Sequence, residues 1–143
     1  MGKSAYIYLV ENSKQQELQL DDVKELISYY QEITSKTGEQ LQWEYSKHSF
    51  PYTVEEQKDQ NGHYLILRGQ DDRYHYILIG VGSVVKQTKD GTNEQFYVQL
   101  MLPDNSEHGD LGKANELAKF LGKKLEGELH LFNGRIMYYY KRK

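Results

Sequence analysis

Two apolar, aromatic runs in the middle of the chain constrain its fold more than any other feature. They are HYLILR at 63–68 and YHYILIGVG at 74–82, separated by the polar break 69–73. Aromatic and β-branched residues favour strands and the break contains turn formers, which predicts a β-hairpin. Both alternating sets of side chains in the second run are apolar, which is typical of a central strand covered on both faces.

The size and composition of the chain predict one domain spanning 1–143, with a core of its own. The formal net charge is −3, so the chain lacks the excess of basic residues that is typical of a general nucleic-acid binder. The absence of cysteine excludes disulfides, thiolate-bound zinc and thiol nucleophiles, and favours a bacterial cytoplasm. Residues 1–4 lead directly into a strand pattern, with no apolar run suited to a signal peptide or a membrane helix.

Two stretches have the apolar spacing of helices that bury one face. The first begins near Asp21, a candidate N-cap, and ends at Gly38. The second spans 111–125 and is followed by Gly127. Residues 11–19 and 104–110 are predicted to be polar loops.

Alternating or apolar runs predict about eight strands around these helices. Turns are expected at 59–62, at Asp90-Gly91 and at Asn133-Gly134, the last as a two-residue hairpin turn. The predicted fold is α+β: one curved, mostly antiparallel sheet with both helices on one face, in the order β-α-β4-β-α-β2. The predicted strands are 5–10, 41–46, 50–54, 63–68, 74–82, 96–102, 129–132 and 136–141.

Tyrosine provides the leading functional hypothesis, because the chain has 13 Tyr and only 4 Phe. A tyrosine ring is apolar while its hydroxyl needs water or a partner, so many Tyr side chains suit the wet face of an open sheet. We therefore predict a non-catalytic binding or protein-interaction module with a Tyr-rich sheet face and no cofactor, for which homodimerisation is one candidate mode of interaction. Ordinary cross-strand packing would explain the same pattern. The candidate residues are Tyr6, Tyr8, Tyr64, Tyr97 and Tyr139.

Charged residues near the central turn provide an alternative hypothesis. Arg68, Arg73 and His75 flank or follow Asp71-Asp72, a grouping that would suit a small enzyme or an anion-binding site. A polar hairpin tip with an internal Asp–Arg pair explains the same residues.

Other sites have weaker patterns. The five histidines show none of the common zinc spacings, and the loop near His108 matches no calcium loop, so no metal is predicted. Gly80-Val81-Gly82 lacks a third glycine and a following helix, which leaves the nucleotide fingerprint incomplete. Single-stranded nucleic acid would find aromatic platforms here but no basic groove, so nucleic-acid and membrane partners are not expected.

Three segments carry a resemblance to a known family: SAYIYLVENSKQQELQLDDVKEL at 4–26, residues Thr34 to Leu41, and RYHYILIGVG at 73–82. Together they resemble a family of small uncharacterised cytosolic proteins from Bacillus-type bacteria, a domain of unknown function. The resemblance implies a helix-on-sheet fold of the saddle type seen in TATA-binding proteins. It implies no activity and assigns no role to any residue, and fold likeness does not carry over DNA binding.

Overall fold

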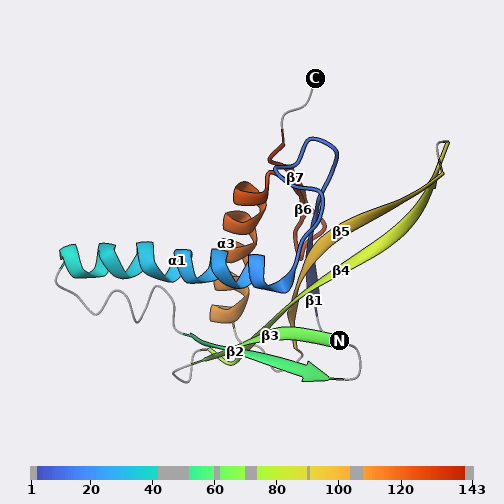
Figure 1. The fold of residues 1–143 in the computed structure, drawn as a ribbon. Helices are drawn as coiled ribbons and strands as arrows, with labels where there is room; N and C mark the ends of the chain where they lie inside the picture. The colour runs from blue at the N-terminus through green and yellow to red at the C-terminus, as the bar shows by residue number, and fades with distance from the viewer. Residues whose placement is uncertain are drawn as a thin grey trace.

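The computed structural model shows an open antiparallel sheet with both helices on one face (Figure 1). It describes residues 3–41, 52–59, 62–69, 74–89, 91–103 and 108–140. This confirms the predicted α+β class, with seven strands in the described residues, in the order β2-β3-β4-β5-β1-β6-β7. The elements are β1 (Lys3–Tyr8), α1 (Leu20–Leu41), β2 (Tyr52–Asp59), β3 (Gly62–Gly69), β4 (Tyr76–Thr88), β5 (Gly91–Leu102), α3 (His108–Leu125), β6 (Glu128–His130) and β7 (Ile136–Tyr138).

One hydrophobic core lies between the helices and the face of the sheet that we call the covered face. Every second strand residue points into it, because side chains alternate across a strand. Tyr30 of α1 also donates a hydrogen bond of 2.6 Å to Glu116 of α3, which connects the two helices above the sheet. Fully buried core residues include Ile7, Val23, Ile27, Leu65, Leu67, Ile77, Ile79, Val98, Leu100, Leu121 and Leu129.

The predicted central hairpin is confirmed. Strands β3 and β4 pair antiparallel, with Leu65 opposite Ile79, and the Gly69 amide donates to the His75 carbonyl over 2.6 Å. The expectation that β4 is covered on both faces is wrong within the described residues. Ile77 and Ile79 are buried under the helices, whereas Leu78 on the opposite face, here called the uncovered face, is only partly buried.

Strands β4 and β5 extend well beyond their predicted ends and form a two-stranded arm, residues 83–89 and 91–95 (Figure 1). The sequence predicted the turn near Asp90-Gly91 but not the strands that lead to it. Polar residues occur on both faces of the arm, because neither face is buried. Val84 and Val85 are accordingly 44% and 64% exposed.

Helix α1 differs from its prediction at both ends. The capping carboxylate belongs to Asp22, which accepts a 2.9 Å bond from the Gln19 amide, and not to Asp21. The helix continues through Gly38 and ends at Leu41. The lower helix propensity of one glycine is therefore not enough to end it. The predicted strand 41–46 is therefore wrong at Leu41, and its remaining residues lie outside the described part of the chain.

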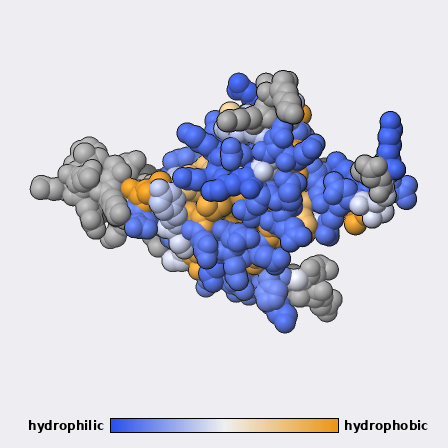
Figure 2. Space-filling view, turned by 45° about the horizontal axis from the view of Figure 1, so that its top comes forward, coloured by the Kyte–Doolittle hydropathy of each residue, from blue (hydrophilic) through white to orange (hydrophobic). Residues whose placement is uncertain are grey.

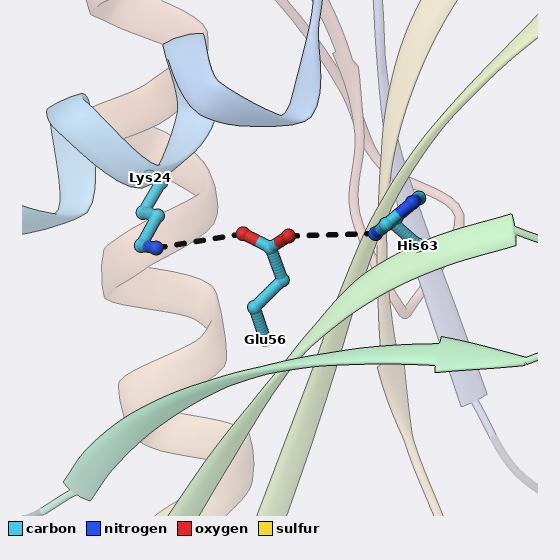
Figure 3. A network of polar contacts seen from close by, with 3 residues as sticks. All are labelled: Lys24, Glu56 and His63. Atoms are coloured by element: carbon cyan, nitrogen blue, oxygen red, sulfur yellow. Dashed lines mark hydrogen bonds and ion pairs between the residues drawn. The ribbon is translucent and has the colours of Figure 1, made fainter.

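Strand β2 begins at Tyr52, directly after Pro51, and is an edge strand, as the proline predicted. Its Glu56 accepts from Lys24 of α1 and contacts His63 of β3, both over 3.4 Å, so three elements meet at this carboxylate (Figure 3). Exposed ion pairs of this kind contribute little to stability.

The surface in Figure 2 is mostly hydrophilic, with apolar residues exposed in limited areas between polar ones. No helix in the described residues combines the length and the hydropathy needed to cross a membrane.

The turn between β6 and β7 has three residues and not the predicted two. The Leu131 amide donates to the Arg135 carbonyl over 2.8 Å, which leaves Phe132, Asn133 and Gly134 in the loop. Gly134 has φ +87°, as the third position of such a loop requires.

The end of α3 shows why the second residue after the helix is a glycine. The helix ends in a Schellman motif, in which the Gly127 amide donates to the Gly122 carbonyl and the Glu126 amide to the Lys123 carbonyl. The left-handed position is held by Glu126, with φ 52°. Gly127 is required for space, since a Cβ there would lie 2.8 Å from the Tyr8 carbonyl oxygen.

These two neighbouring positions should respond oppositely to substitution. We expect Glu126→Gly to raise the free energy of unfolding by about 0.5–1 kcal/mol, because glycine adopts positive φ without strain. Gly127→Ala should lower it by about 1–3 kcal/mol through the clash with β1. Urea denaturation of both variants checks the pair, and equal effects at the two positions would contradict this account.

Candidate binding site on the uncovered sheet face

Three predicted tyrosines form one cluster on the uncovered face. Tyr6 and Tyr8 come from β1 and Tyr97 from β5, and each pair of ring centroids is 5.8 Å apart. The register explains the cluster, because Tyr8 lies opposite Tyr97 in the β1–β5 ladder. On the other side of β5, Tyr97 lies opposite Gly82 of β4, where a Cβ would be 2.5 Å from the Tyr97 hydroxyl oxygen. The absence of a side chain at Gly82 therefore leaves room for the Tyr97 ring.

A hollow of about 550 Å³ lies beside this cluster on the same face. Its volume falls within the range of ordinary ligand pockets. Gly80 leaves the floor open, since a Cβ built there would meet only the Tyr64 Cβ, at 3.9 Å. The residues that line the hollow include Tyr64, Ile66, Leu78, Gly80, Gln99 and Met101.

Gln99 provides the side-chain amide of the hollow and lies opposite Gly80 across the β4–β5 ladder. Its Nε2 donates to the Ser4 hydroxyl over 3.1 Å and to the Tyr6 hydroxyl over 3.3 Å. These bonds connect the hollow to the tyrosine cluster through one side chain.

The chain shows clear similarity to a family and to a solved structure. A family model described as a domain of unknown function, DUF1885, matches residues 3–141. The chain belongs to the DUF1885 family. Its sequence is 38% identical to a protein of unknown function from Bacillus stearothermophilus, whose crystal structure aligns over 90% of this chain and 94% of that one with a TM-score of 0.53. No curated protein matches the chain significantly.

The predicted resemblance to an uncharacterised Bacillus-type family is confirmed by these comparisons. They leave the function of the DUF1885 chain unknown, as predicted. Membership of this family therefore assigns no activity to the residues of the site.

The other two predicted tyrosines lie apart from the three-ring cluster. Tyr64 is on the uncovered face and forms a wall of the hollow. Tyr139 packs on the covered side, with its ring about 3 Å from the position of a Cβ at Gly122 of α3. In β7, Met137 lies opposite the buried Leu129, so alternation along the chain places Met137 and Tyr139 together on the covered side and not on the predicted Tyr-rich face.

The alternative site residues of this DUF1885 chain are engaged elsewhere or lie outside the described residues. Arg68 pairs with Glu55 and stacks on Tyr76, with its guanidinium carbon 5.4 Å from the ring centroid. The hydrogen bond and charge of Glu55 raise the pKa of Arg68 above its ordinary value. The backbone amide of His75 donates to Asp110, and Arg73 lies outside the described part of the chain.

Asp110, predicted to lie in a polar loop, is a fully buried residue in the first turn of α3. It accepts a 2.5 Å bond from the Tyr52 hydroxyl and 3.0 Å contacts from the His75 amide. A buried polar group needs such hydrogen-bond partners, so Asp110 joins β2, the residue before β4 and α3 as a structural group. The sequence signal that could have identified Asp110 is an acidic residue at the start of a helix, where the helix dipole favours negative charge. Among the described residues, no three His, Asp or Glu side chains are grouped to hold a metal ion.

Tyr8 differs electrostatically from an exposed tyrosine. Burial raises its pKa above the ordinary value of 10.0, and the neighbouring Tyr6, Tyr97 and Glu128 raise it further. The folded chain therefore holds the Tyr8 proton more tightly than the unfolded chain does. The resulting stabilisation is complete below about pH 10 and is lost as the pH rises through the folded-state pKa.

Tyr8→Phe should make the fold less sensitive to alkali. We expect the free energy of unfolding to fall less between pH 9 and pH 11 in this variant than in the unmodified chain, because Phe has no proton to lose. Urea denaturation at each pH measures the difference. Tyr138→Phe, at a 44% exposed ring, is the matched control, and an equal change in both variants would contradict the explanation.

Proposed function

We propose that this DUF1885 protein is a non-catalytic binding module of the bacterial cytoplasm that receives an uncharged, apolar ligand in the hollow of its uncovered sheet face. The hollow at Gly80 carries this proposal. It is a concave, mainly apolar space on a face that no described helix covers.

The chemistry of the lining supports binding without catalysis. Ile66, Leu78 and Met101 provide apolar surface, while Tyr64 and Gln99 provide polar atoms. None of the described lining residues is a carboxylate, a histidine, a lysine or a serine, the usual sources of acid–base or nucleophilic chemistry. A cytoplasmic location is supported by the absence of cysteine from the sequence.

An apolar ligand gains binding free energy when it covers an apolar surface such as this one. Each Å² of apolar surface removed from water contributes about 25 cal/mol. Gly80 increases the space available, because any larger side chain in the middle of β4 would occupy the hollow from its floor. Glycine weakens the interior of a strand. Gly80 therefore leaves the sheet face open and lowers the stability of the strand.

Gly80→Val should fill the hollow and abolish binding without harming the fold. The Cβ meets only an ordinary contact, and valine is a better strand former than glycine, so stability should stay equal or rise by about 0.5–1 kcal/mol. The measurement is an NMR titration with naphthalene, which follows the methyl groups of Ile66, Leu78 and Met101. These signals should shift in the unmodified chain and not in Gly80→Val.

Gly112→Ala is the control, because a Cβ at that exposed site in α3 meets nothing within 4 Å. It should leave the titration unchanged while it stabilises the helix by up to about 1 kcal/mol. Naphthalene shifts that persist in Gly80→Val would contradict the proposed site. Methyl signals that already change with protein concentration, before naphthalene is added, would instead assign the uncovered face to self-association.

A further inference from the structure

Building on the function proposed above, we infer that the ligand is a flat, uncharged ring compound with one hydrogen-bond donor, such as a phenol, and that Gln99 Oε1 accepts this hydrogen bond. Gln99 is then the residue that determines specificity in an otherwise apolar hollow.

The hydrogen bonds of Gln99 leave one end of its amide available. Its Nε2 is occupied by the hydroxyl groups of Ser4 and Tyr6. Its Oε1 accepts no hydrogen bond from the described residues. Every buried side-chain nitrogen and oxygen in the described residues has a partner, so this unpartnered oxygen is in contact with solvent. A carbonyl oxygen can only accept, so its ligand partner must be a donor.

The two hydroxyl groups also fix the orientation of Gln99. Two contacts to the same Nε2, from residues two positions apart on one face of β1, restrict rotation of the amide. An acceptor held in place before binding costs less conformational entropy when the ligand arrives. The Gln99 oxygen is therefore suited to selecting among apolar ligands of equal size.

The shape of the hollow favours a ring. Its floor at Gly80 is bare backbone within a sheet, and Tyr64, which also lines the hollow, has its Cβ 3.9 Å from the position of a Cβ at Gly80. A flat compound can contact the backbone surface on one face while its edge contacts the tyrosine ring. The thioether of Met101 suits the same ligand, since sulfur makes favourable contacts with aromatic edges.

The electrostatics of the hollow favour an uncharged compound. No described lining residue carries a formal charge. Arg68, two residues after Ile66 on the same face of β3, is already paired with Glu55. An anion in the hollow would lose water without gaining an ion pair, which disfavours its binding.

The test compares three probes of similar size at pH 7: naphthalene, 2-naphthol and 2-naphthoate. We expect 2-naphthol to bind more tightly to the unmodified chain than to Gln99→Met by about three- to tenfold, the effect of one neutral hydrogen bond. Naphthalene should bind both chains equally, because methionine keeps the apolar volume. Gln87→Met, on the exposed arm, is the matched control and should match the unmodified chain with every probe.

The outcomes separate this inference from the function on which it rests. If naphthalene binds in the hollow but 2-naphthol is unaffected by Gln99→Met, the role of Gln99 is wrong and the apolar site stands. If Gly80→Val leaves the binding of naphthalene intact, the site itself is wrong. If 2-naphthoate binds more tightly than 2-naphthol, the ligand class is wrong, and loss of that preference in Arg68→Met would assign the site to an anion.

Discussion

The one-sided cover of the sheet is the constraint on which the rest of the structure depends. Helices α1 and α3 pack on the same face, so the residues of each strand are sorted into a buried row and an uncovered row. Ile79 and Leu100 face each other in the buried row, and this pairing places Gly80 opposite Gln99 in the next row. A slip of one residue would expose the core residues to water, so the burial of the core also fixes the composition of the uncovered face.

The uncovered face is suited to contact with water without being simply polar. Tyrosine and glutamine provide polar atoms next to Ile66, Leu78 and Met101. The three-ring cluster fills the space over Gly82, whereas the space over Gly80 stays open. Two glycines on the same face of β4 therefore have different effects: the first is open to a ligand, and the second is occupied by Tyr97.

The sequence predicted those features that depend on local pattern. The amphipathic helices, the central hairpin and the edge position of β2 all follow from spacing or from a single proline. The hollow could not be predicted, because it requires Gly80 to meet Tyr64 on one side and Gln99 on the other, and pairing between separate strands is not a local property. Asp110 was missed for a similar reason, since its partners Tyr52 and His75 come from distant parts of the chain.

The exposed arm illustrates a second limit of pattern analysis, because its strands bury neither face. An isolated two-stranded ribbon is marginally stable in water, so the arm depends on its continuity with the body of the sheet. Ser83 donates to Glu94 across the arm over 2.7 Å, and Gln95 anchors its base by donating to the Leu9 carbonyl over 3.2 Å. The pair Gly82–Tyr97 is the last that belongs to the tyrosine cluster, and the arm begins directly beyond it. The Leu9 amide also donates to the Phe96 carbonyl over 2.9 Å, so the segment that follows β1 holds the base of the arm to the body of the sheet.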